Sequence, residues 1–441
     1  MKKLLTAQEV RELAQEYRVK FVRLQFTDVL GDFKNVAITV EELERALEGA
    51  IPFDSAAVEG FDGHREADIL LHPDPSTFVI FPWRPRDGAV ARLICEARTA
   101  SGEPFEGCSR SVLKRALAPL QERGWRLLVG VESEFFLFHT DGQGRPETRT
   151  HDQAGYCALT PLDLGENARR DMVLTLEEMG IEVKSSHHEI APGQHEIGLK
   201  DDTVLAMADK VSTFRFVVRT VAQRHGLHAT FMPKPLTGQA GSGMSLSLSL
   251  WSNGKNMFYD PDAPRCLSPL AYNFIGGLVR HAPALTAITN PLVNSYKRML
   301  PGRMSPLLAG WSDDNRCTML RVPVHQTGGA RILLRSPDST ANFYLALAAI
   351  TAAGLDGITN AIPAPEPLPD GDGATLAAQI RDYGLPRNLG EALDSLASDE
   401  VIRGVLGETI YQRYTTHKRD EWERFQRQVH AWEIEEYLTR F

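Results

Sequence analysis

Two pairs of glutamates stand in the sequence at spacings that would bring carboxylates together. Glu189 and Glu196 flank a Pro-Gly dipeptide, which is a strong turn signal, so residues 185–199 are predicted to form a β-hairpin. If residues 191–194 form the loop, Glu189 lies directly opposite Glu196, and like charges in that arrangement destabilise a hairpin. Either the carboxylates are solvated at the hairpin edge, or they share a cation, and their oxygens would suit Mg²⁺ or Mn²⁺.

The second pair, Glu132 and Glu134, lies in an almost continuous apolar run over residues 127–138. Runs of this kind are typical of central strands, and residues two apart on a strand point to the same face. The pair could instead lie in solvent on an edge strand, but four apolar residues follow Glu134 at once. We therefore expect a buried pair that requires protons or cations.

Patterns of apolar residues indicate an α+β fold around these glutamates. The first hundred residues predict a small unit with strands over 20–28, 77–81 and 89–96, and a linker follows at 101–107. Residues 244–251 alternate between apolar and mostly serine side chains, which predicts a further strand. The remainder predicts long helices over residues 109–123, 163–180, 203–225, 268–285 and 340–355.

Composition bounds the class of protein. At 441 residues the chain suggests two or three domains, and 43% hydrophobic with 24% charged residues is ordinary for a globular enzyme. A net charge of −9 argues against binding to nucleic acid or to an anionic membrane. The five cysteines contain no CxxC pair, and no signal peptide or membrane span is visible, so a cytoplasmic location with reduced thiols is expected.

Several long strings of the sequence resemble the glutamine synthetase family, in its shorter bacterial class I form. The resemblance covers nearly the whole chain and rests on VGVESEFFLF, SSHHEIAPGQHEIG, HGLHATFMPKPL, GSGMSLSLSL and TNPLVNSYKR. It implies a β-grasp domain over 1–103 and a catalytic domain over 104–441, built on a curved antiparallel sheet with helices. It also implies a homo-oligomer, a dodecamer of two hexameric rings, and a reaction that joins glutamate and ammonia using ATP.

In this family two divalent ions serve the reaction, and the resemblance implies their ligands. The three glutamates that hold one Mg²⁺ or Mn²⁺ ion are matched by Glu134, Glu189 and Glu196. The second ion uses a glutamate, a histidine and another glutamate, and Glu132 matches the first of these. Ser245 and Leu333 stand at the other two positions, so the second site is expected to be degenerate. Whether ATP binds depends on that second site.

Other matched positions concern the substrates. Asp54 matches the aspartate that deprotonates ammonium across the subunit interface, and Arg298 matches an arginine that grips the substrate carboxylate. Phosphate and carboxylate oxygens are expected to face Arg316, Arg321, Arg331 and Arg335. His188 is expected to face nucleotide or metal, or else to be a core histidine.

Two further positions depart from the family pattern. Met304 stands where a mobile flap carries a glutamate that closes the substrate site, and Ala240 replaces an asparagine that contacts glutamate. Together with Ser245 and Leu333, these replacements suggest a protein impaired or inactive in ATP-dependent glutamine synthesis. Such a pseudoenzyme would act as a regulatory or structural paralogue and could assemble with a true glutamine synthetase.

Two alternatives keep an enzymatic role. The first is an ATP-dependent ligase that forms glutamine, a γ-glutamyl amide or another amide from an altered substrate. The second is an ATP-independent metal enzyme that uses the three-glutamate ion as a Lewis acid, although the sequence supplies no clear nucleophile for it.

Overall fold

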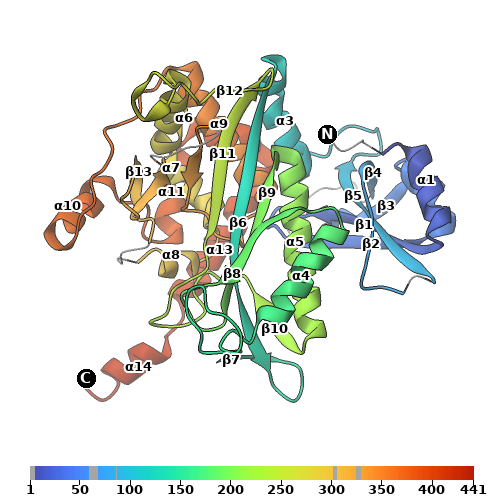
Figure 1. The fold of residues 1–441 in the computed structure, drawn as a ribbon, viewed down its shortest axis with the longest axis horizontal. Helices are drawn as coiled ribbons and strands as arrows, with labels where there is room; N and C mark the ends of the chain where they lie inside the picture. Colours follow the sequence, from blue (N-terminus) through green and yellow to red (C-terminus); the bar gives the residue numbers. More distant parts are fainter. Residues whose placement is uncertain (1–4, 59–67, 86, 301–304, 324–328) are drawn as a thin grey trace.

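The computed structural model describes residues 5–58, 68–85, 87–300, 305–323 and 329–441, which form two β-sheets and their helices (Figure 1). The smaller sheet has five strands in the order β2-β1-β5-β4-β3. β1 and β5 run parallel, and the other neighbours run antiparallel. Its strands are β1 (Val19–Thr27), β2 (Phe33–Thr39), β3 (Ile51–Asp54), β4 (Asp68–Ile80) and β5 (Ala89–Arg98).

The N-terminal sheet packs against α1 (Ala7–Glu16) and α2 (Leu43–Leu47). α1 begins at a capping box, in which the Thr6 side chain accepts from the Glu9 backbone N–H and the Glu9 carboxylate accepts in return from Thr6 N–H. Apolar residues that alternate along β1 and β5 fill the space between the sheet and these helices. The predicted α+β class is confirmed for this unit.

The larger sheet has ten strands and is organised around β6 (Trp125–Thr140). β9 (Gln194–Thr203) and β11 (Met244–Ser252) flank β6, and both run antiparallel to it. The path β13-β14-β15-β11-β6-β9-β8 is completed by β7 and β10 on β6 and by β12 on β11. The remaining strands are β7 (Pro146–Thr150), β8 (Val183–His188), β10 (Leu227–Thr230), β12 (Lys255–Asn256), β13 (Leu308–Ser312), β14 (Thr318–Arg321) and β15 (Ile332–Leu334).

Helices of the second unit pack against one face of the large sheet and against one another. α3 and α5 contact β6, and α9 packs on α3, α5 and α6. Among the described residues, no helix combines the length and the apolar character needed to cross a bilayer. The helices are α3 (Ser109–Glu122), α4 (Glu166–Glu178), α5 (Val204–Arg224), α6 (Pro269–Arg280), α7 (Ala282–Thr289), α8 (Ser295–Arg298), α9 (Phe343–Thr359), α10 (Gly373–Tyr383), α11 (Leu389–Ser398), α12 (Glu400–Leu406), α13 (Glu408–Gln426) and α14 (Ala431–Tyr437).

Successive side chains of β6 point to opposite faces of the sheet, so only every second one packs against this helical core. Val129, Val131 and Phe135 are buried among core residues. Glu132 and Glu134 therefore point to the other face, because side chains alternate along a strand. The predicted burial of this glutamate pair is met only in part, since the Glu132 side chain keeps 39% of its surface exposed.

A buried asparagine joins the N-terminal unit to the helical core. Asn342 Nδ2 lies 2.9 Å from Asp28 O and 2.8 Å from Ser109 Oγ, while its Oδ1 caps the start of α9. Gly31 closes the same loop with a φ of +96°, and a Cβ there would lie 3.0 Å from Asn342 Cα. The loop between β1 and β2 is thus fitted directly against the beginning of α9.

We predict that Asn342→Ala lowers the free energy of unfolding by about 2–4 kcal/mol, because it removes a helix cap and leaves buried polar groups without partners. The measurement is the thermal unfolding midpoint at one fixed protein concentration. The control is Asn360→Ala at the exposed end of the same helix, where Asn360 Nδ2 donates to Asp356 Oδ1. A control that destabilises the protein as much as Asn342→Ala would contradict this account of the junction.

Candidate metal and anion site

The register of three neighbouring strands brings carboxylates together on the face of the sheet that lacks the helical core. Glu134 on β6 lies directly opposite Glu196 on β9, and Glu196 lies opposite His187 on β8. Glu189 follows the last residue of β8, and its backbone N–H donates to Gln194 O at 2.8 Å. The structure therefore brings Glu134, Glu189 and Glu196 close enough for their charges to act on one another.

The predicted opposition of Glu189 and Glu196 is wrong. The loop of the hairpin is residues 190–193, one position earlier than predicted, so Glu189 opposes Gln194 instead. The turn is held by Gly193, which adopts a φ of +66° and donates its N–H to Asp152 Oδ1 at 2.8 Å. That tertiary contact comes from a loop far away in the sequence and fixes where the chain reverses.

The cluster is held by specific hydrogen bonds. Glu134 Oε2 accepts from Gly243 N at 2.9 Å and from Gln194 Nε2 at 3.0 Å. His187 Nε2 lies 2.9 Å from Glu189 Oε1 and 3.8 Å from Glu196 Oε1. Ligand atoms of His187, Glu189 and Glu196 all lie within 4.8 Å of one another, which is close enough for one ion to contact all three.

Electrostatics indicate that this cluster requires positive charge. Burial, followed by the nearby charge of Glu189, raises the pKa of Glu134 to about 7. Burial and then the charges of Glu134 and Glu132 raise the pKa of Glu196 to about 9. Carboxylates that repel one another in this way hold protons near neutral pH unless a cation replaces them. Carboxylate oxygens with one adjacent imidazole fit a Mg²⁺ or Mn²⁺ ion.

Glu132 has different neighbours. It lies opposite Ser245 on β11 and opposite Gly198 on β9, and its Oε1 is 2.9 Å from Lys184 Nζ. Leu333 lies on β15 and pairs with Ser247, two residues after Ser245 on β11. These neighbours offer one neutral hydroxyl and one ammonium, and they do not fit a second divalent ion.

Four of the five predicted arginines lie near one another, and two of them, Arg298 and Arg335, lie near Glu134. Burial and then the charges of Arg321, Arg316 and Arg298 lower the pKa of Arg335, whereas the nearby Glu134 carboxylate raises it. Guanidinium groups that repel one another form a ready site for phosphate or carboxylate oxygens. The Arg298 side chain packs directly against Gly241 and Gly243. A Cβ at either glycine would lie 3.0 Å or less from that side chain, so larger residues would crowd it.

Other predicted residues lie apart from this site. Arg331 Nη1 lies 3.3 Å from Asp201 Oδ2, so its charge is paired on a neighbouring part of the sheet. Asp54 lies on β3 of the N-terminal sheet and accepts from the Ala56 N–H. Ala240, in contrast, borders the site: it packs with Phe136, which shares a face of β6 with Glu134, and the carbonyl of the next residue, Gly241, accepts from Gln194 Nε2 at 3.1 Å. Met304 falls outside the described residues.

His188 lies on the opposite side of the hairpin from His187 and Glu196. Its Nδ1 lies 2.7 Å from Glu189 O and its Nε2 lies 3.0 Å from Asp152 Oδ1, and it is fully buried. Both partners accept hydrogen bonds only, which favours an imidazolium. Burial lowers the pKa of His188, but these hydrogen bonds outweigh it and the net pKa is raised. His188 thus holds the hairpin turn through Asp152 and does not face the glutamates.

Sequence reasoning missed three residues of the site. His187 stands in the quoted HHE string, and the period of two along a strand could have placed it with Glu189 and Glu196. Gln194, which orients Glu134, follows the same turn and was hidden by the register error. Lys184 gave no signal, because its position depends on an irregularity of β8.

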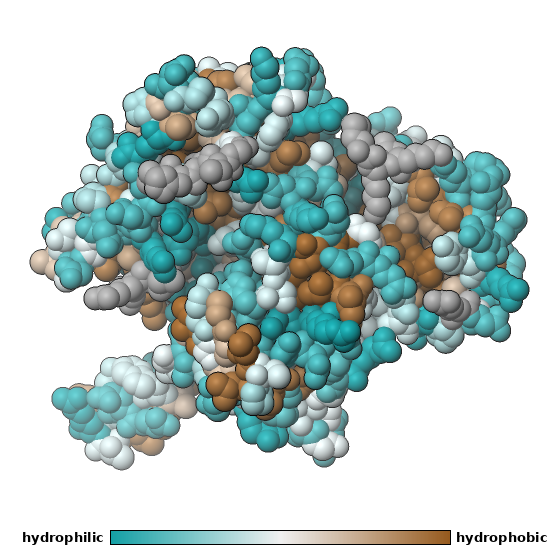
Figure 2. Space-filling model, viewed as in Figure 1, coloured by the Kyte–Doolittle hydropathy of each residue, from teal (hydrophilic) through white to brown (hydrophobic). Residues whose placement is uncertain are grey.

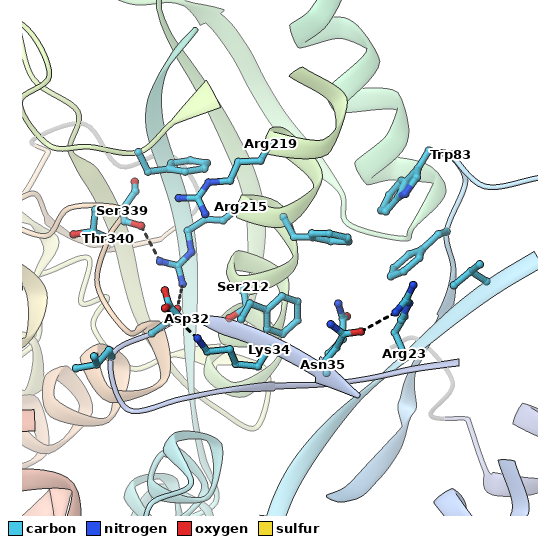
Figure 3. Close-up of a pocket in the computed structure, with 18 of the residues that line it drawn as sticks. Arg23, Asp32, Lys34, Asn35, Trp83, Ser212, Arg215, Arg219, Ser339 and Thr340 are labelled. Carbon is cyan, nitrogen blue, oxygen red and sulfur yellow. Dashed lines mark hydrogen bonds and ion pairs between the residues drawn. The ribbon is translucent and has the colours of Figure 1, made fainter. Parts of the chain in front are cut away.

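A cavity of about 760 Å³ lies elsewhere, where the N-terminal sheet meets α5 (Figure 3). Arg215 projects into it and donates to Ser339 O at 3.1 Å and Gly31 O at 3.0 Å. Ser339 Oγ contacts Ser133 Oγ at 2.8 Å, and Ser133 points away from Glu132 and Glu134 along β6. This cavity is therefore on the other side of the sheet from the glutamates.

Comparisons with known proteins agree with this architecture. Residues 18–100 match the model of the glutamine synthetase β-grasp domain, and residues 106–437 match that of the glutamine synthetase catalytic domain. The chain belongs to the glutamine synthetase family. It is 48% identical over 439 residues to a glutamine synthetase of Clostridium saccharobutylicum, and 47% identical over 443 residues to one of Thermus thermophilus, with 99% of each chain covered in both cases. A solved structure described as a GmaS/ADP complex has 33% identity and a TM-score of 0.88, with both chains fully covered.

Within this glutamine synthetase fold, Glu196→Gln is expected to weaken Mn²⁺ binding by at least about tenfold, because the charge of the ligand set governs affinity for hard cations. Isothermal titration calorimetry on metal-stripped protein measures the effect. Glu182→Gln makes the same charge change on an exposed residue beside the hairpin, where Glu182 Oε1 pairs with Lys200. Equal losses in the two variants would show that Glu196 is not a ligand.

Proposed function

We propose that this protein is a divergent glutamine synthetase homologue that binds one divalent ion and is impaired in ATP-dependent glutamine synthesis. In this proposal Glu134, Glu189 and Glu196 hold Mg²⁺ or Mn²⁺, and the protein acts as a regulatory or structural paralogue. The divalent ion, when bound, supplies a fixed positive charge between the strands. The chain's own residues orient the carboxylates and surround them with arginines.

The observation that carries the proposal is the environment of Glu132. In a phosphoryl-transfer site, metal ions bridge the phosphates and neutralise the developing charge. Glu132 has a hydroxyl opposite it at Ser245 and an ammonium at Lys184, and neither replaces a charged ligand. Leu333, which pairs with Ser247 on the same sheet, adds only an apolar side chain. Loss of a single preorganised group that stabilises charge in the transition state typically slows a reaction about 10²–10³-fold. Met304 and Ala240 add two changes at substrate positions.

Retention of the arginines supports a second candidate, an ATP-dependent ligase with an altered substrate. Arg298, Arg316, Arg321 and Arg335 are all present, and burial followed by the charges of the first three lowers the pKa of Arg335. Clustered guanidinium groups repel one another, and a paralogue that binds no phosphate or carboxylate would have no use for such a cluster. Ala240 lies in an apolar cluster with Leu236 and Ala191, which would suit an acid or amine with a larger apolar group.

Assembly into a homo-oligomer is part of the proposal, with a dodecamer and mixed assembly with a true glutamine synthetase as its specific forms. Support comes from large apolar side chains that one chain leaves exposed, some of them visible as brown surface in Figure 2. Exposed apolar residues gather in the segment before α4 and in the C-terminal region, at Tyr156, Leu159, Leu162, Leu164, Trp432, Leu438 and Phe441. Asp54 would then meet the site of a neighbouring subunit. A cytoplasmic location remains an expectation.

The test is glutamine formation and ADP release by the purified protein, over a panel of carboxylates and amines. We predict glutamine formation at least about 10²-fold slower than that of the double variant Ser245→His/Leu333→Glu, which restores charged and imidazole ligands. Robust glutamine synthesis by the native chain would contradict impairment. ADP release with one other carboxylate or amine, in the absence of glutamine formation, would favour the altered ligase.

A further inference from the structure

An irregularity of β8 brings a lysine to the glutamates. Val183 pairs with Leu199, and Ser185 pairs with Gly198. β8 therefore contains one extra residue, Lys184, which pairs with no residue of β9. A β-bulge of this kind re-aims a side chain that regular alternation would send to the other face. As a result Lys184 extends across β9 toward β6, and its Nζ lies 2.9 Å from Glu132 Oε1.

A glycine on β9, the strand between β8 and β6, leaves space for the Lys184 side chain. Gly198 lies between Ser185 and Glu132 in register. A Cβ at that position would lie 2.5 Å from Ser185 Oγ and 3.3 Å from Glu132 Cγ. The bulge, the missing side chain at Gly198 and the short hydroxyl at Ser245 together create room beside Glu132, and Lys184 uses that room.

We propose that Lys184 is the resident cation of Glu132, so that each chain binds a single divalent ion at Glu134, Glu189 and Glu196 and excludes a second one at Glu132. This inference rests on the proposed one-ion function and names the residue that enforces it. Lys184 and Glu132 keep 47% and 39% of their side-chain surfaces exposed, so their contact contributes little to folding stability. Its effect is local, because an ammonium at this distance repels a divalent ion that approaches the same carboxylate.

Counting bound Mn²⁺ tests the proposal directly. Metal-stripped protein is titrated with Mn²⁺, and free Mn²⁺ is followed by electron paramagnetic resonance. We expect one ion per native chain. In the Ser245→His/Leu333→Glu background, adding Lys184→Gln should tighten the second Mn²⁺ at least about tenfold relative to adding Lys200→Gln. Lys200 is the matched control, because it is an exposed lysine on the neighbouring strand that pairs with Glu182.

Two results would overturn the proposal: two ions of similar affinity in the native chain, or equal effects of Lys184→Gln and Lys200→Gln. If the triple variants do not fold, the single variants Lys184→Gln and Lys200→Gln are compared at millimolar Mn²⁺, where only the former should gain a weak second ion. Glutamine formation is measured separately. A native chain that binds one ion and still makes glutamine efficiently would contradict the proposed function while leaving the role of Lys184 intact.

Discussion

Repulsion among the carboxylates of Glu134, Glu189 and Glu196 is the constraint on which the rest of the site depends. Two strand pairings and one turn place these groups together, and burial raises the pKa values of Glu134 and Glu196. The Gly243 N–H and the Gln194 amide both donate to Glu134 and hold its carboxylate in place. A divalent cation bound there would convert this repulsion into attraction, so the geometry of the hairpin and the binding of metal are coupled.

Charge is distributed unevenly around this cluster. On one side Arg298 and Arg335 provide positive charge close to Glu134. On the other side Lys184 neutralises Glu132. A site that ordinarily needs two mobile divalent ions would here use one mobile ion and one lysine fixed to the backbone. A fixed ammonium carries half the charge of a divalent ion and cannot bridge phosphate oxygens by coordination, which is the physical basis for proposing impaired phosphoryl transfer.

Much of the fold followed from sequence patterns, because apolar periodicity specifies which face of an element is buried. The apolar run of β6 and the long helix α5 were predictable in this way, and the Pro-Gly dipeptide marked the turn at Gly193. The hairpin register was not, since it depends on the contact between Gly193 and Asp152, 41 residues apart. The position of Lys184 depends on a β-bulge, and no local pattern reveals one. Arg331 resembled the other arginines in sequence, but a salt bridge with Asp201 separates it from them.

The central claim is that one divalent ion binds among Glu134, Glu189 and Glu196 while Lys184 takes the place of the other. Anomalous diffraction at the manganese absorption edge, from crystals of the native protein grown with excess Mn²⁺, tests this most directly. We predict one anomalous peak per chain, in contact with oxygens of those three glutamates, and Lys184 Nζ still bound to Glu132. A second peak at Glu132, with Lys184 displaced, would contradict the claim.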